Sequence, residues 1–248
     1  MSITLETKVW EGDWELVLST NRLKNIQERC MHTFTYRTIF INNVSNIDKV
    51  KKAADKLVDK NIIDNYYVVQ DFCNEALEHF HLTEKDFGKG YYYSIAELVS
   101  IYLCKTKYLL HFSSDVIPEK NLPTTWVNDL LNTLKINPKV KVANLTWDRK
   151  YKEAEKESIS KDGNFFYGYG FSDQMYLIRT DDFITPIYSE KNDASARYPA
   201  YGGELFEKRV DAWMRNHKHL RATYSQGSYS HKNFTKNTLI KKIQILIN

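Results

Sequence analysis

The segment YLLHFSSDVIP, at residues 108–118, carries the clearest chemical signal in the chain. A mainly apolar run, typical of a buried strand, ends abruptly in Ser113, Ser114 and Asp115. A carboxylate directly after a central strand is well placed to hold a divalent cation, which would bridge the phosphate oxygens of a bound nucleotide diphosphate. The alternative is that Asp115 only caps a turn before Pro118.

Several common motifs for other chemistries are absent from the sequence. No GxGxxG follows the first predicted strand, and no GxxxxGK[ST] occurs, which argues against a dinucleotide-binding Rossmann enzyme and a P-loop enzyme. No GxSxG nucleophile elbow is present either.

The elements that must position this segment are predicted to alternate between strands and helices. Runs of β-branched and apolar residues predict strands at 2–10, 38–44, 66–70, 108–112, 140–147 and 174–180. Helical spacing and start signals predict helices over 13–30 and after Ser45/Asp48, Ser94/Glu97, Thr124 or Thr125, and Gly202-Gly203. Residues 148–170 show no clear period, which predicts a long functional loop or a hairpin excursion.

This alternation predicts an α/β fold with a Rossmann-like, mostly parallel sheet flanked by helices in a single domain. Ligands of such sheets bind at the carboxyl ends of the strands. The polar residues expected at that edge are Glu11, Asn42, Asn43, Asp71, Ser113, Ser114 and Asp115.

The order of the elements, ending in Ser113-Ser114-Asp115, resembles the GT-A nucleotide-sugar glycosyltransferases of the nucleotide-diphospho-sugar transferase superfamily. In that family the apolar strand ends in a DxD motif that binds Mn²⁺ or Mg²⁺ and the donor diphosphate. Asp115 matches the last acidic position, while serine stands at the first. The resemblance covers about residues 2–231 and implies a metal ligand at Asp115, with donor contacts at Ser113 and Ser114.

The resemblance implies further catalytic and metal-binding residues. Glu204 matches the base of the xED motif, although Leu205 replaces the second acid, and His231 matches a late histidine that serves as a second metal ligand. Asp173 lies in a Ser-Asp-Gln stretch like one in lipopolysaccharide-type relatives, which would contact donor or acceptor. Each also has a plain alternative: Glu204 complements a helix dipole, His231 lies on the surface and Asp173 is a turn residue.

For the donor nucleoside, the resemblance points to the ends of the first three strands. Glu11 follows the first strand, Asn42 and Asn43 end the second, and Asp71 follows the third, where it would read uracil or another base.

Composition sets the remaining expectations. The net charge of +4 comes without a dense Lys/Arg stripe in the main body, so we expect no nucleic-acid partner. Three widely spaced cysteines form no CxxC pair, which favours a reducing compartment. The first ten residues lack the features of a signal peptide, and charges interrupt the most apolar stretch, at 94–112. We therefore expect a cytoplasmic protein.

Residues 232–248 form a basic, amphipathic tail behind the predicted GT-A-like domain at 1–231. Its apolar stripe beside lysines suits peripheral docking on the inner, anionic face of a membrane, where lipid-linked acceptors reside, or packing back onto the domain.

The sequence thus predicts a metal-dependent glycosyltransferase, which moves a sugar from a nucleotide-diphosphate sugar to a hydroxyl of a glycan or lipid-linked glycan acceptor. The transfer would invert the anomeric centre if Glu204 is a true base. A sugar nucleotidyltransferase is the second enzyme class, but KVWEGDWE stands where such enzymes carry a GxGTR-like loop. A non-catalytic nucleotide-sugar-binding domain is the third possibility.

Overall fold

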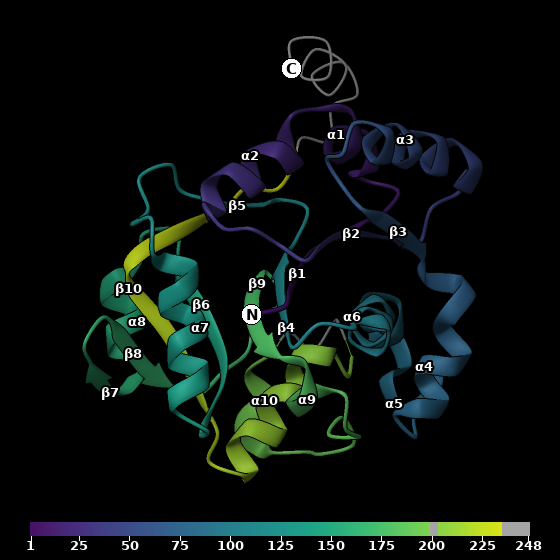
Figure 1. Ribbon diagram of the computed structural model, residues 1–248. Helices are drawn as coiled ribbons and strands as arrows, with labels where there is room; N and C mark the ends of the chain where they lie inside the picture. Colours follow the sequence, from purple (N-terminus) through teal and green to yellow (C-terminus); the bar gives the residue numbers. More distant parts are fainter. Residues whose placement is uncertain (199–202, 235–248) are drawn as a thin grey trace.

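A computed structural model describes residues 1–198 and 203–234, in which one sheet runs through the molecule and helices cover both of its faces (Figure 1). Its strands are β1 (Ile3–Val9), β2 (Tyr36–Ile41), β3 (Asn65–Val68), β4 (Tyr108–Phe112), β5 (Val116–Pro118), β6 (Val140–Trp147), β7 (Ser158–Asp162), β8 (Phe165–Gly168), β9 (Met175–Arg179) and β10 (Leu220–His231). Its helices are α1 (Trp14–Ser19), α2 (Arg22–Cys30), α3 (Ile47–Asp59), α4 (Cys73–His79), α5 (Glu84–Phe87), α6 (Tyr91–Leu103), α7 (Trp126–Ile136), α8 (Tyr151–Lys156), α9 (Thr180–Phe183) and α10 (Phe206–Asn216).

The strands lie in the order β3-β2-β1-β4-β9-β6-β10-β8-β7, and β5 pairs with β10. From β3 to β10 they run in one direction, except for β9, which is antiparallel to both β4 and β6. The prediction of a mostly parallel sheet with helices on both faces is therefore confirmed.

Side-chain alternation along β4 divides the core into two layers. Leu109 packs under α6 in a cluster that also holds residues of α4 and α10, whereas Leu110 and Phe112 point to the opposite face, beneath α2 and α7. Trp126 of α7 is fully buried there, and burial of such a side chain stabilises the fold by roughly 1.5–3 kcal/mol.

The predicted strands agree with the structure to within a few residues, but outside residues 148–170 two strands were not predicted. β5 is only three residues long, and β10 is rich in Ser, Thr and Tyr with Gly227 inside it. β10 runs parallel to β6 and antiparallel to β5, so it carries the late part of the chain back to the end of β4.

Several helix predictions need correction. The single helix predicted over 13–30 is two helices, α1 and α2, separated at residues 20 and 21. Asn46, not Ser45, is the N-cap of α3, because its side chain accepts the backbone N–H of Lys49 at 3.0 Å.

The capping box predicted at Ser94 and Glu97 is wrong, since α6 already begins at Tyr91. Ser94 instead accepts a hydrogen bond at 2.8 Å from the backbone N–H of Phe206, the first residue of α10. Ser94 therefore joins α6 to α10.

Residues 148–170 hold the short helix α8 and the β7–β8 hairpin, which turns at Gly163 with a positive φ of 52°. The hairpin was one of the two predicted possibilities. Within residues 1–198 and 203–234, no helix is both long and apolar enough to span a membrane. Most of the predicted amphipathic tail, from residue 235 onward, lies outside the described residues.

Candidate functional site

Asp115 and His231 come together at the carboxyl edge of the sheet. β5 begins at the residue after Asp115 and pairs with the end of β10, so that Val116 lies opposite His231. The Nε2 atom of His231 lies 3.1 Å from Oδ2 of Asp115, and both side chains are half-buried. Two residues that are 116 positions apart in the chain thus form one pair because β10 returns to this edge.

The imidazole of His231 is held in orientation by residues behind it. Gln174 donates from Nε2 to Nδ1 of the ring at 3.1 Å, and Tyr229 donates to Oε1 of the same glutamine at 2.9 Å. This arrangement leaves Nε2 directed at Asp115. The hydrogen bond to Asp115 raises the pKa of His231, and the nearby charges of Asp148 and Asp173 act in the same direction.

Asp148 is positioned by an unusual turn at the end of β6. Asp148 and Arg149 both adopt positive φ angles, 45° and 59°, which non-glycine residues rarely do. The turn lets the Asp148 carboxylate accept the backbone N–H of His231 at 2.8 Å. Strained backbone of this kind often occurs at functional sites, and here it adds a carboxylate beside the Asp115–His231 pair.

Asp173 also lies near the pair. The hydroxyl of Ser113 donates to the backbone carbonyl of Asp173 at 2.8 Å, and the backbone N–H of Ser113 donates to Gln174 at 2.8 Å. These bonds fasten the segment before β9 to the end of β4. They leave the carboxylate of Asp173 free to meet α10.

The partner of Asp173 is Glu207, in the first turn of α10. The two carboxyl groups share a hydrogen bond, and burial together with the charge of Asp173 raises the pKa of Glu207 to about 9. Glu207 is therefore protonated at neutral pH and donates to Asp173. The sequence reasoning missed Glu207, although its place in the first turn of a helix after Gly-Gly was a usable signal.

Glu204, the residue selected from the sequence, points elsewhere. Its carboxylate forms ion pairs with Lys208 at 2.6 Å and Arg209 at 3.2 Å, and it lines a separate charged hollow with Glu190 and Lys191. Burial opposes its ionisation, but the hydrogen bond from Lys208 and the charge of Arg209 outweigh this and lower its pKa. The structure does not bring Glu204 together with Asp115.

These opposite pKa shifts predict opposite stability profiles for two isosteric variants. The raised pKa of Glu207 lowers the stability of the wild-type protein as the pH rises from 4.5, the ordinary pKa, towards about 9. In this range the unfolded chain releases the Glu207 proton, whereas the folded protein keeps it, so folding must take up a proton. Glu207→Gln removes that loss, so its melting temperature should gain on wild type by several degrees between pH 5 and pH 9.

Glu204→Gln is the matched control, three residues away and just before the N-cap of α10. Its lowered pKa contributes stability above the ordinary pKa, which is lost as the pH falls. The control should therefore melt slightly below wild type at neutral pH and equal it in acid. Parallel profiles for the two variants, measured by thermal melts across pH, would contradict the assigned environments.

The Ser113-Ser114-Asp115 turn is anchored to the loop after β1. Ser114 donates its hydroxyl to Asp13, whose other oxygen accepts the backbone N–H of Trp10 at 2.8 Å. Arg22, at the start of α2, donates Nε to the carbonyl of Ser114. The sequence did not point to Asp13 or Arg22, because neither belongs to a local motif.

Arg22 places a positive charge beside the acidic pair. Burial lowers its pKa to about 10, while the charges of Asp115 and Asp13 favour the charged form, so the guanidinium remains protonated at neutral pH. Its Nη2 atom is buried and has no hydrogen-bond partner among the residues that the structure describes. A buried donor without a partner is costly, and a bound anion would satisfy it.

The predicted nucleoside residues are only partly gathered. Glu11 accepts the backbone N–H of Ser45 at 2.7 Å and donates its own backbone N–H to Asn43 at 3.3 Å, so the ends of β1 and β2 meet. Asn43 in turn donates to the carbonyl of Tyr92 at 3.0 Å, and Asn42 is bonded through its backbone to Val9 at 2.8 Å.

Asp71 is exposed in the turn at residues 69–72, after β3. Within the described part of the chain, no hydrogen bond or ion pair joins its side chain to the Glu11 and Asn43 group.

Below the edge lies a largely buried polar network. Nζ of Lys8 lies 2.5 Å from Glu6, 3.0 Å from Glu97 and 3.1 Å from Nδ1 of His111, while Tyr176 donates to Glu97. Burial alone would raise the pKa of Glu6, yet the charges of Lys8 and His111 lower it to about 2.

Glu6, Glu97 and His111 are also close enough to share a metal ion, with ligand atoms within 4.8 Å of one another. The ammonium of Lys8 already stands among those three groups and supplies the positive charge. The network is therefore an internal ion cluster.

Comparisons with known proteins identify solved structures that share this fold. Solved structures with the same fold include glucosyl-3-phosphoglycerate synthase from Mycobacterium tuberculosis with Mn²⁺, uridine diphosphate and phosphoglyceric acid, which is 13% identical, at a TM-score of 0.50 over 99% of this chain and 77% of that one. CMP:2-keto-3-deoxy-manno-octonic acid synthetase complexed with CTP is 11% identical, at a TM-score of 0.50 over 100% of this chain and 98% of that one.

The fold is that of GT-A-like nucleotide-sugar enzymes. A mycobacterial protein of 13% identity also matches, at a TM-score of 0.50 over 98% of this chain and 71% of that one. No family model matches the sequence, and no curated protein does. The resemblance stated from the sequence is thus confirmed at the level of the fold, while the reaction is a separate question.

Proposed function

We propose that this chain is a metal-dependent glycosyltransferase that moves a sugar from a nucleotide-diphosphate sugar to a hydroxyl acceptor. The observation that carries the proposal is the pair of Asp115 and His231, 3.1 Å apart at the carboxyl edge of the sheet. Ligands of open α/β sheets bind at this edge. Asp148 and Asp173 add negative charge beside the pair, which suits a bound cation.

The two side chains fit one divalent ion, Mn²⁺ or Mg²⁺. Two ligand atoms at right angles, each about 2.1 Å from an octahedral ion, lie about 3 Å apart. The observed 3.1 Å between the Asp115 oxygen and the His231 nitrogen matches this spacing. Imidazole and carboxylate both bind first-row divalent metals. For Nε2 of His231 to bind the ion, the ring proton must lie on Nδ1 and the Gln174 amide must turn so that its Oε1 accepts that proton, as outer partners of metal ligands do. When bound, the ion would stabilise the charge that grows on the leaving diphosphate.

Arg22 is the proposed second support for that diphosphate. Its unpartnered Nη2 lies in the same corner as Asp115, and a guanidinium matches phosphate oxygens well. The hydroxyls of Ser113 and Ser114 already donate hydrogen bonds to Asp173 and Asp13. We therefore propose that these two residues, predicted to contact the sugar donor, hold the turn in shape. Glu11 and Asn43 remain the proposed contacts of the nucleoside.

The proposed base is Asp173, with Glu207 as its hydrogen-bond donor. In the transfer, an acceptor hydroxyl oxygen attacks the anomeric carbon, its proton passes to Asp173, and the bond to the phosphate oxygen breaks with its electron pair on the departing nucleoside diphosphate. A single displacement of this kind inverts the anomeric centre. Glu204 remains the alternative base from the sequence, but its ion pairs place it in another hollow.

A sugar nucleotidyltransferase is the second candidate. CMP:2-keto-3-deoxy-manno-octonic acid synthetase matches over nearly the whole of both chains, which favours this class as much as the synthase favours the first. The loop after β1 separates the two, because KVWEGDWE lacks the glycine-rich phosphate loop of nucleotidyltransferases.

A thermal-shift screen followed by product analysis tests the proposal. UDP and UDP-sugars should raise the melting temperature with Mn²⁺ present and fail to do so with EDTA, since only ligands of the native state stabilise it. The best donor should then release a nucleoside diphosphate when an acceptor is added. Stabilisation by CTP or another triphosphate, with release of pyrophosphate, would establish the nucleotidyltransferase instead. No shift with any nucleotide would contradict both.

A further inference from the structure

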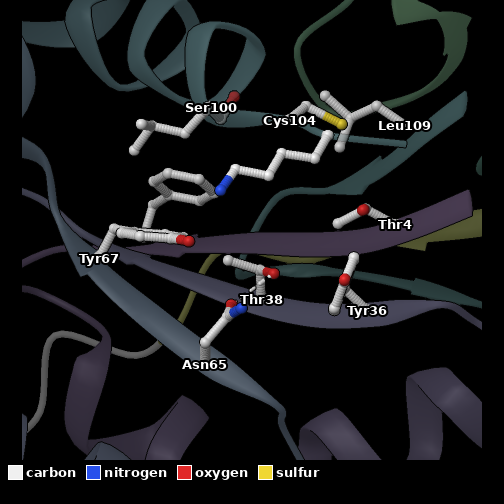
Figure 2. A pocket seen from close by; sticks show the side chains of 11 residues that line it. Thr4, Tyr36, Thr38, Asn65, Tyr67, Ser100, Cys104 and Leu109 are labelled. Carbon is white, nitrogen blue, oxygen red and sulfur yellow. Dashed lines mark hydrogen bonds between the residues drawn. The ribbon is translucent and has the colours of Figure 1, made fainter. Parts of the chain in front are cut away.

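A hollow of about 140 Å³ lies between α6 and the sheet, at the amino ends of the strands and away from Asp115 (Figure 2). Residues on one face of four neighbouring strands form its floor, and the end of α6 with the following loop forms its roof. The lining residues are Thr4, Tyr36, Thr38, Phe40, Asn65, Tyr67, Ser100, Leu103, Cys104, Lys105 and Leu109.

The hollow exists because small polar side chains stand where a core normally has large apolar ones. Thr4 and Thr38 lie on the sheet floor and Ser100 lies opposite on α6, and all three are almost fully buried. Tyr36 and Lys105 of the lining are exposed, so the hollow is open to solvent and a small molecule can enter it.

The walls suit a flat ring. Phe40 and Tyr67 stack on each other, with ring centroids 5.6 Å apart and planes 28° from parallel, and they form one side of the hollow. Leu109 and Cys104 lie across from Tyr67 in Figure 2. A cavity of about 150 Å³ holds a single benzene ring, so the observed volume fits one six-membered ring.

The polar groups favour a negative charge on that ring. Lys105 is the single charged residue among those that line the hollow, and none of them is acidic. Thr38 donates its hydroxyl to Oδ1 of Asn65 at 2.7 Å, and the amide nitrogen of Asn65, which also lines the hollow, is a further donor. A carboxylate would take hydrogen bonds from both groups.

We propose that this hollow is a binding site for a small aromatic carboxylate, separate from the nucleotide site. The ring lies against Phe40 and Tyr67, and the carboxylate meets Lys105 and the amide of Asn65. The occupant is a single-ring monoanion, because the volume fits one ring and the exposed Lys105 is the single charge among the lining residues.

Cys104 provides a direct readout of occupancy. It is half-buried within the lining, whereas Cys30 and Cys73 are buried elsewhere and burial raises the pKa of both thiols, which slows their reaction. Modification of wild-type protein by neutral iodoacetamide, followed at each cysteine by peptide mass spectrometry, therefore reports on the hollow. Saturating benzoate should slow the modification of Cys104 at least tenfold and leave the other two unchanged.

Two comparisons identify the chemistry. Benzamide has the same shape without the charge, and it should need at least tenfold higher concentration for equal protection. Lys105→Gln should weaken protection by benzoate at least tenfold. The matched control is Lys107→Gln, which removes a lysine two residues away that lies over the ring of Tyr108, outside the lining, and it should behave as wild type.

Cys104→Ser supplies an independent measurement, since benzoate should still raise its melting temperature. Equal protection by benzamide and benzoate, or normal protection in Lys105→Gln, would overturn the proposed ligand class. Absence of both protection and thermal stabilisation at 50-fold molar excess and above, up to millimolar benzoate, would show that the hollow is a packing defect.

Discussion

Asp115→Asn is expected to remove Mn²⁺-dependent binding of UDP while leaving the fold intact. Loss of a residue that only supports a metal ligand typically costs 10–100-fold in affinity, so loss of a proposed ligand should cost about 100-fold or more. Asparagine keeps the shape of the side chain, and its amide oxygen still accepts a hydrogen bond from Nε2 of His231. Titration of UDP with and without Mn²⁺, read by calorimetry, measures the effect.

The pH dependence separates this effect from simple destabilisation. In wild type the hydrogen bond to Asp115 raises the pKa of His231, so the pair contributes stability that is fully present below about pH 6.5 and is lost as the pH rises through the raised pKa. The stability deficit of Asp115→Asn should therefore be largest in acid and fade at alkaline pH.

Metal binding should follow the opposite trend in wild type, because a metal needs the unprotonated imidazole. Mn²⁺-dependent binding should strengthen from pH 5 to pH 8 in wild type and stay absent in the variant throughout. Asp162→Asn, which changes an exposed acid on the β7–β8 hairpin, is the matched control and should bind as wild type does. Undiminished Mn²⁺-dependent binding in Asp115→Asn would rule out the proposed metal site.

Asp115 could be identified from the sequence because its signal is local. An apolar strand followed at once by polar residues places a carboxylate at the sheet edge whatever the rest of the chain does. The same reasoning placed Glu11 and Asn43 at neighbouring strand ends, which the structure brings together. Predictions of this kind need only the strand boundaries to be right.

The partners of Asp115 depend on contacts that no local pattern records. His231 was assigned through a family resemblance, and its approach to Asp115 depends on β10, a strand that the sequence reasoning did not predict. The twelve residues of β10 mix Ser, Tyr and Gly, so they lack the clean alternation that marked the other strands. Arg22 and Asp13 reach the site only because the loop after β1 folds against the Ser113-Ser114 turn.

The choice between Glu204 and Glu207 shows a different limit. Both acids lie near the start of α10, and three residues along a helix correspond to nearly one turn, so the sequence cannot tell which one faces the sheet edge. The structure decides the matter through packing: Phe206 bonds to Ser94 of α6, which fixes the rotation of the helix. Glu207 then meets Asp173, and Glu204 meets Lys208.

Asp173→Asn is expected to lower the rate of sugar transfer by about 10²–10⁴-fold, the usual contribution of a general base. Affinity for the nucleotide should remain within a few-fold of wild type, because the proposed metal and diphosphate contacts lie at Asp115, His231 and Arg22. The bond from Ser113 goes to the backbone carbonyl of Asp173, so the substitution leaves the turn in place. Glu204→Gln is the control, and its ion pairs away from the site predict a rate near that of wild type.

The neighbouring Glu207 makes this prediction sharper. The charge of Asp173 helps to hold the pKa of Glu207 near 9, so its removal lets Glu207 ionise at lower pH and stand in as a base. Asp173→Asn should therefore recover part of its rate as the pH rises towards 9, whereas the double variant Asp173→Asn/Glu207→Gln should stay inactive throughout. A damaged fold would produce no such recovery. If Glu204→Gln abolishes transfer and Asp173→Asn does not, the base is Glu204 and the helix must turn when the acceptor binds.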